Sequence, residues 1–134
     1  MSGYTKLNLQ TEVDDMAAGR MPPGIEAHFA RGALELEQSG VSYMKLAPDF
    51  HPPFGHKHAE QEEIYVIISG SAVVKVEDEE IELGRLDAIR LAPDATRALK
   101  AGPEGCEVIL FGAPQPAEQD AEMLPGWWEA NGAS

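Results

Sequence analysis

Short runs in which hydrophobic and polar residues alternate follow one another along most of this chain, separated by Gly, Pro and Asp. Strict alternation over a few residues is typical of a half-buried strand, and strands recurring about every 8–12 residues indicate an all-β sandwich or small barrel. The pattern predicts strands at 4–9, 25–31, 33–37, 41–46, 72–76, 81–83, 87–91, 96–100 and 107–111.

The N-terminal region also contains one helix signal. Thr11 is a suitable N-cap with acidic residues in the turn that follows, Gly19 is a suitable end, and Pro22 and Pro23 block continuation. We therefore expect a helix of a turn or two over 11–18. Since helical periodicity is weak in the middle of the chain, the prediction is one all-β domain over 1–134.

The stretch 55–70 holds the longest apolar run, 64–68, and two of the four histidines, His56 and His58. Residues two apart on a strand project to the same face, so the two imidazoles should lie side by side. A carboxylate that joins them where the chain bends would complete a two-His, one-carboxylate set, which binds non-haem iron and related divalent metals. This stretch predicts a metal-type pocket on a β scaffold.

Two carboxylates compete for the third position. If Ile64, Val66 and Ile68 face the core, alternation places Glu62 on that face and Glu63 on the opposite one. In a sandwich both faces of a strand can be covered. The periodicity leaves the choice between Glu62 and Glu63 open.

Composition narrows the range of partners. The 134 residues include 23 Asp and Glu against 10 Lys and Arg, a net charge of −13, which disfavours nucleic acid and anionic membranes as partners. The first residues lack the apolar segment of a signal peptide, so we expect a cytoplasmic protein. Cys106, the single cysteine, lies in an apolar run and is expected to be a buried structural thiol.

A family resemblance enters at the histidine stretch. The sequence His-x-His, four residues, Glu, six residues and Gly, here His56, His58, Glu63 and Gly70, resembles the first motif of the cupins. The second cupin motif falls at 87–97 and matches only Asp87, Pro93 and the general pattern. The resemblance covers about residues 41–112. It implies an all-β cupin double-stranded β-helix (jelly-roll barrel) with a core at about 34–112, an N-terminal extension at 1–33 and a C-terminal tail at 113–134.

The resemblance also selects the ligands and shows two departures. It favours Glu63 as the ligand and leaves Glu62 in reserve. Phe50 stands where the first motif normally has glycine, and Arg97 stands where metal-binding cupins have their third histidine. His56, His58 and Glu63 then form a three-ligand set. Arginine cannot ligate a metal, but it can pair with a carboxylate.

Two functions follow from this resemblance. In the first, Fe, Mn, Ni or Zn is held by His56, His58 and Glu63, Arg97 anchors an anionic small-molecule substrate, and Tyr65 lines the pocket, as in a metal-dependent isomerase or oxygenase. In the alternative, a metal-free binding module, Arg97 replaces the metal electrostatically. Cupin membership further implies a homodimer.

The C-terminal tail ends in two adjacent tryptophans, Trp127 and Trp128. Such a pair in a polar tail is expected to cover an open end of the barrel or a subunit interface. A lid that contacts the ligand is the alternative interpretation.

Overall fold

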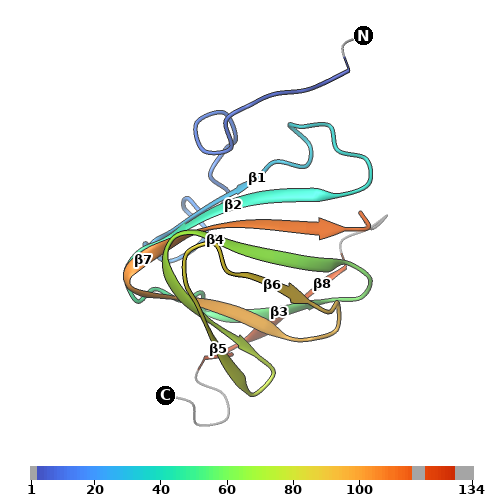
Figure 1. The fold of residues 1–134 in the computed structure, drawn as a ribbon. Helices are drawn as coiled ribbons and strands as arrows, with labels where there is room; N and C mark the ends of the chain where they lie inside the picture. Colours follow the sequence, from blue (N-terminus) through green and yellow to red (C-terminus); the bar gives the residue numbers. More distant parts are fainter. Residues whose placement is uncertain (1–2, 116–119, 129–134) are drawn as a thin grey trace.

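The computed structural model describes residues 3–115 and 120–128. Within these ranges the chain forms eight β-strands and no helix (Figure 1). No helix in those ranges could therefore cross a membrane. The strands are β1 (Ile25–Phe29), β2 (Gly40–Leu46), β3 (Phe54–His58), β4 (Glu62–Val76), β5 (Glu79–Leu83), β6 (Ala88–Leu91), β7 (Arg97–Ala113) and β8 (Ala121–Pro125).

Two long strands, β4 and β7, pair antiparallel along most of their lengths and link two layers. The first half of β4 and the second half of β7 belong to a layer ordered β1-β2-β7-β4-β6. Their other halves belong to a layer ordered β8-β3-β7-β4-β5. Figure 1 shows the sheet curling into a barrel. The predicted all-β jelly-roll barrel is confirmed.

Glycines allow β4 and β7 to pass from one layer to the other. Gly70 has φ +72° and Gly105 has φ +79°, and register shifts in the β4–β7 ladder flank Gly70. A Cβ atom on Gly70 would lie 2.1 Å from the carbonyl oxygen of Gly105, so the two backbones can approach this closely only without a side chain. The prediction of two separate strands at 96–100 and 107–111, with a break at 102–105, is therefore wrong, because the break is a corner inside β7.

The N-terminal region differs from the prediction. Residues 4–9 form no strand, and 11–18 form turns rather than a helix. The carboxylate of Asp15 accepts hydrogen bonds from the backbone N–H groups of Ala17 and Ala27, which ties the segment to β1. Asp15 thus accepts one local and one long-range hydrogen bond, where the prediction had placed it in the first turn of a helix. Residues 33–37, predicted as a strand, form turns, and strand β8 was not predicted.

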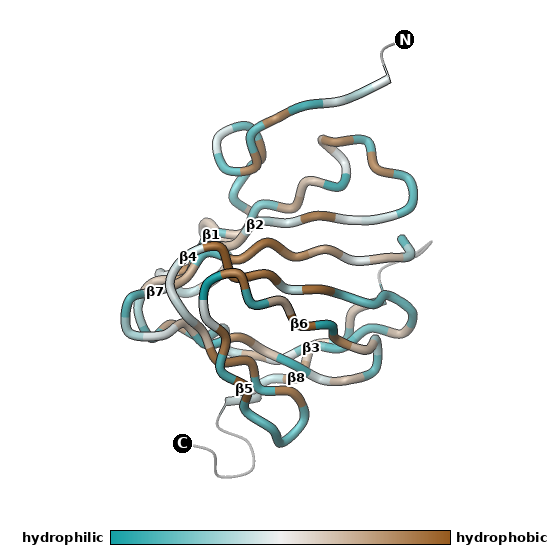
Figure 2. Tube along the Cα trace, in the orientation of Figure 1, coloured by the Kyte–Doolittle hydropathy of each residue, from teal (hydrophilic) through white to brown (hydrophobic). Residues whose placement is uncertain are grey.

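The interior of the barrel is apolar and is built from alternate residues of the long strands. Tyr65 and Ile67 of β4 and Val108 of β7 are buried in one cluster. Ile64 and Ile68 lie on the outer face and are 40% and 37% exposed. The assumption that Ile64, Val66 and Ile68 face the core is therefore wrong. Figure 2 shows hydrophobic residues along the strands, and in β4 they occupy the outer face as well as the inner one.

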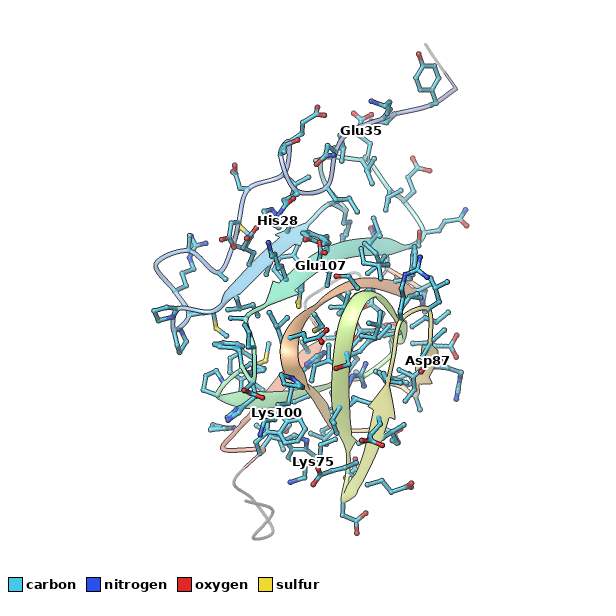
Figure 3. All side chains as sticks on the ribbon, turned by 60° about the vertical axis from the view of Figure 1, so that its left-hand side comes forward. His28, Glu35, Lys75, Asp87, Lys100 and Glu107 are labelled. Atoms are coloured by element: carbon cyan, nitrogen blue, oxygen red, sulfur yellow. The ribbon has the colours of Figure 1, made fainter. Side chains whose placement is uncertain are left out.

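Both tryptophans pack at one end of the barrel. Figure 3 shows Lys75 at this end, away from Glu35 and the N-terminal segment. The ammonium group of Lys75 donates to the carbonyl oxygen of Trp127 at 2.8 Å and lies 5.1 Å from its ring centroid. A Cβ atom on Gly55 would lie 2.6 Å from the Trp127 ring, and Trp128 is buried. Neither tryptophan lines the main cavity, so their placement matches a barrel-end cover rather than a lid over a ligand.

Candidate metal centre

A cavity of about 580 Å³ opens into the barrel between the β1–β2 side of the first layer and strands β3 and β8. This volume lies in the range of small-molecule sites. Most of its wall is apolar, and a small polar group occupies one part of it. That group comprises His56, His58, Gln61, Glu63 and Asp120.

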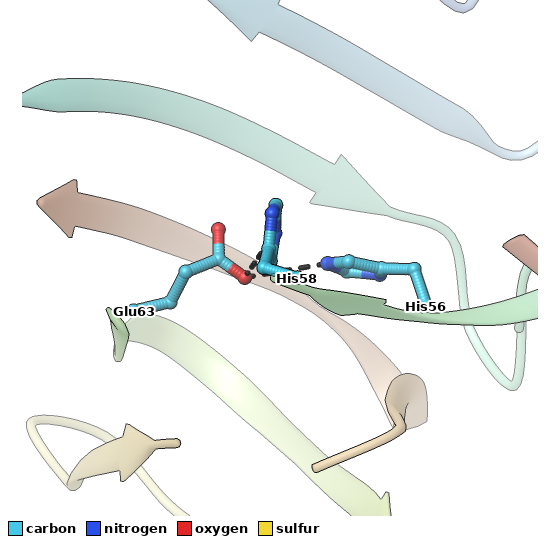
Figure 4. Close-up of side chains that lie close together, drawn as sticks. All are labelled: His56, His58 and Glu63. Atoms are coloured by element: carbon cyan, nitrogen blue, oxygen red, sulfur yellow. Dashed lines mark hydrogen bonds and ion pairs between the residues drawn. The ribbon is translucent and has the colours of Figure 1, made fainter. Parts of the chain in front are cut away.

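Two histidines and one glutamate that line this cavity lie close together, as Figure 4 shows. His56 and His58 project from the same face of β3, as their spacing predicts, and Glu63 comes from the start of β4. The Nε2 atoms of His56 and His58 each lie 3.3 Å from Oε1 of Glu63. One ligand atom from each of the three residues fits within 4.8 Å of the others, so the group could hold a metal ion.

Asp120 fixes the orientation of His58. The Nδ1 atom of His58 donates to Oδ1 of Asp120 at 2.8 Å. The other carboxylate oxygen of Asp120 accepts from the backbone N–H groups of Glu60 and Gln61 at 2.9 and 3.1 Å. With its proton on Nδ1, His58 presents an unprotonated Nε2, the form that binds metals, and carboxylate–histidine pairs of this kind orient metal ligands.

That Nε2 atom is the clearest test of whether the residues fit a metal. It is buried and makes no hydrogen bond to any described residue, although Oε1 of Glu63 is 3.3 Å away. A buried ring nitrogen without a hydrogen bond is unfavourable, and a metal ion bound in place of a proton would satisfy it. The Oε2 atom of Glu63 also accepts no hydrogen bond from the described residues, whose contacts are all with Oε1. The donor set fits a divalent metal.

Arg97 supports Glu63 from behind. Its side chain is fully buried, and one amino group, Nη2, donates to Oε1 of Glu63 at 2.6 Å. The other, Nη1, donates to the carbonyl oxygens of Ala92, Pro93 and Ala95 at 3.0, 3.2 and 2.7 Å. Arg97 does not line the cavity. Its predicted role as an anchor for an anionic substrate does not fit this placement, whereas its predicted pairing with Glu63 does.

The same contacts set the charges of the site. Burial disfavours the charged form of Glu63, but the hydrogen bonds with His56 and Arg97 and the nearby His58 imidazole outweigh burial, so the pKa of Glu63 lies well below its ordinary value. Burial also opposes charge on His58, yet Glu63 and Asp120 raise its pKa. Asp120, despite some burial, has its pKa lowered to about 2 by His58 and the two backbone N–H groups. Both carboxylates are therefore ionised at neutral pH, as metal ligation and support of a ligand require.

Tyr65 and Glu62 lie on opposite faces of β4. Tyr65 lines the cavity, as the alternation from Glu63 predicts, and its hydroxyl lies 3.5 Å from Oε1 of Glu63. Glu62 points outward and pairs with Arg90 at 2.7 Å. Glu62 is therefore not placed to serve as the reserve ligand.

Asp120 was not predicted from the sequence. It lies 62 residues from His58 in a tail without strong periodicity, and it reaches the site because β8 pairs with β3 in the register His58 to Ala121. The signal available was weak: the residues of 121–125 were compatible with a strand, but nothing specified their partner.

No protein-family model matches this chain, and no curated protein matches it. Solved structures do. The cupin protein BF4112 from Bacteroides fragilis is 26% identical with a TM-score of 0.70, and the match covers 89% of this chain and 91% of that chain. A variant of Streptomyces PAC13, solved with uridine, is 17% identical with a TM-score of 0.73, covering 94% and 93%. Oxalate decarboxylase from Bacillus subtilis is 21% identical with a TM-score of 0.71, covering 90% of this chain and 33% of that one.

The curled two-layer sheet and the inward-facing histidine–glutamate group show that this chain is a small β-barrel protein with a candidate metal centre in its central cavity. With the structural matches, they identify the chain as a member of the cupin superfamily.

Proposed function

We propose that this protein is a small-molecule cupin that binds a divalent metal through His56, His58 and Glu63. The observation that carries the proposal is the buried Nε2 atom of His58, which has no hydrogen bond from the residues that the structure describes, while Asp120 holds the other ring nitrogen. A metal ion is the group that this arrangement of donors suits best.

A bound metal would polarise a ligand oxygen or activate dioxygen, and Fe, Mn, Ni and Zn all accept such ligands. The chain's own residues would supply the rest. Asp120 holds His58 in the ligating tautomer, Arg97 keeps Glu63 ionised, and the apolar wall excludes water. An isomerase and an oxygenase both agree with a centre of three protein ligands, so a screen for activity should include both reaction types.

The ligand is proposed to be a small organic molecule held in the 580 Å³ cavity. Support comes from the size of the cavity and from the structural neighbour PAC13, which was solved with uridine. Similarity to PAC13 at 17% identity supports a shared fold, and the identity of the ligand has to come from this cavity itself.

Metal titration tests the proposal. Purified protein should contain or take up Fe, Mn, Ni or Zn at one ion per chain, measured by elemental analysis and calorimetry. His56→Ala and His58→Ala should each abolish that stoichiometric binding. His51→Ala, which removes a histidine outside the cavity, should not. Stoichiometric binding that survives in the His56 and His58 variants would contradict the proposal.

A metal-free binding module is the second candidate, and one contact favours it. The guanidinium of Arg97 lies 2.6 Å from Glu63, where it supplies a permanent positive charge beside the carboxylate. If the site lacks only the third histidine of metal-binding cupins, Arg97→His should create or strengthen metal binding. An unchanged metal affinity in that variant, with no binding by the wild type, would favour a site built around the ion pair.

We also propose a homodimer that buries the apolar outer face of β4 and β7. On this face Ile64 of β4 pairs with Phe111 of β7, and Val66 pairs with Ile109. The side chains of Ile64 and Phe111 are 40% and 45% exposed. Exposed apolar patches of this kind mark interaction sites. Light scattering should give twice the mass of the chain, and Phe111→Glu should give a monomer. A monomeric wild type would contradict the dimer.

A further inference from the structure

Two arginines line the opening of the cavity, although the chain as a whole is strongly acidic. Arg20 precedes β1 and Arg31 follows it, and both side chains are exposed. In the part of the chain that the structure describes, neither has a carboxylate within 4.0 Å. In a chain with 23 acidic and 10 basic residues, two exposed arginines that line the same cavity without an acidic partner indicate a local site for an anion.

The acidic groups inside the cavity do not cancel this positive charge. Glu63 is paired with Arg97, and Asp120 accepts hydrogen bonds from His58 and two backbone N–H groups. Each carboxylate therefore has a compensating partner of its own. An anionic group at the opening would meet Arg20 and Arg31 before it met either carboxylate.

The wall between the opening and the histidines is apolar and adaptable. Four of the five methionines in the chain line it, together with aromatic side chains. Methionine side chains are flexible and polarisable, so they fit irregular apolar bodies and aromatic edges. Phe29, 51% exposed, also lines the cavity and is two residues from Arg31 in the sequence. The methionine and phenylalanine residues of this wall are Met16, Met21, Met44, Met123, Phe29 and Phe54.

We propose that the ligand of this cavity is an amphipathic organic anion, with its carboxylate, sulfonate or phosphate group at Arg20 and Arg31 and its apolar body along the methionine wall. The inference rests on the proposed function for the inner end of the site, where the far end of the same molecule would reach His56, His58 and Glu63. The sequence predicted Arg97 as the residue that binds the anionic group, whereas this proposal assigns that role to Arg20 and Arg31.

Two dyes of matched shape test the charge requirement. 8-Anilinonaphthalene-1-sulfonate carries a sulfonate on an aromatic body, and N-phenyl-1-naphthylamine has the same body without the charge. Arg20→Gln and Arg31→Gln should each weaken binding of the sulfonate by about three- to tenfold, the range for one exposed charged contact, while the neutral dye binds unchanged. Binding of the sulfonate alone should also weaken with added salt.

The control is Arg85→Gln, which removes the same charge from an exposed position outside the cavity. Phe111→Thr on the outer face reports any dye bound there and should not change the cavity affinity. Equal sulfonate affinity in the Arg20, Arg31 and Arg85 variants would overturn the inference, as would a sulfonate affinity that only Phe111→Thr reduces.

Metal titration of the same variants separates this inference from the proposed function. Arg20→Gln and Arg31→Gln should bind metal as the wild type does, because neither contacts the histidines. Arginine-dependent sulfonate binding by a protein that takes up no metal would support the anion site and contradict the metal centre. Metal uptake without arginine-dependent binding of the sulfonate would support the metal centre and contradict the anion site.

Discussion

His58 donates from Nδ1 to the carboxylate of Asp120 at 2.8 Å, and this bond joins β3 to the residue that precedes β8. This bond leaves Nε2 of His58 directed toward Glu63, with no hydrogen bond to any residue in 3–115 or 120–128. The C-terminal segment thereby acts on the candidate metal centre without supplying a ligand, since its carboxylate determines which ring nitrogen of His58 is free.

Replacing Asp120 by Asn should weaken metal binding by about 10- to 100-fold, the range for loss of a group that orients a metal ligand. Asn can still occupy the space but cannot compensate the charge on His58 or hold its proton on Nδ1 as strongly. Isothermal titration of Zn or Mn into the variant measures the effect. Asp94→Asn, at an exposed turn, is the matched control. Equal affinities in the two variants would mean that the Asp120 contact is structural only.

Replacing Arg97 by Met should destabilise the fold by about 3–5 kcal/mol, because it leaves Glu63 as an uncompensated buried charge and removes the donor from three carbonyl oxygens. Arg90→Met removes an exposed pair with Glu62 and should cost less than about 1 kcal/mol. Urea unfolding of both variants gives the comparison. Similar losses of stability would show that the buried pair contributes no more than the surface pair.

Cys106 should react slowly with thiol reagents in the folded protein. Burial, with the nearby charge of Glu107, raises its pKa to about 11, so little thiolate forms at pH 8. Iodoacetamide should label the native protein far more slowly than the urea-unfolded protein, with mass spectrometry as the readout. Labelling of native protein at the rate of a free cysteine would show that the strand around Cys106 opens readily.

Glu107 should contribute to the loss of stability in acid. Tyr43 and Ser69 donate to its carboxylate and lower its pKa. A carboxylate with a lowered pKa in the folded state stabilises the protein above its unfolded pKa of about 4.3, and that contribution is lost as the pH falls through the folded value.

The difference in unfolding free energy between wild type and Glu107→Gln should therefore be largest at neutral pH and should shrink below about pH 4.3. Glu82→Gln, at an exposed position of β5, is the matched control. A difference that stays constant down to about pH 3 would mean that the lowered pKa of Glu107 is not coupled to folding.

The sequence was informative where a residue's role depends on its neighbours in the chain. The two-residue spacing of His56 and His58 on a strand was enough to predict that they share a face. The strands predicted at 72–76 and 81–83 also form, as the end of β4 and most of β5, and they pair antiparallel. The choice between Glu62 and Glu63 failed on periodicity alone. Both faces of β4 are apolar, so Ile64 and Ile68 gave no indication of which face was inside.

Other features depend on partners far away in the sequence. Asp120 reaches His58 through the pairing of β8 with β3, and Asp15 holds the N-terminal segment by accepting from Ala27 on β1. The predicted break at 102–105 is a corner within β7 because Gly105 has to pass close to Gly70. No local pattern specifies such contacts.

The most direct test of the metal centre is a crystal grown with Mn or Zn and measured at the absorption edge of that metal. We predict one anomalous peak per chain, bound by Nε2 of His56, Nε2 of His58 and the carboxylate of Glu63, with nitrogen–metal distances of about 2.0–2.2 Å. A map with no peak between these residues at a saturating metal concentration, with Glu63 still paired to Arg97, would contradict the account.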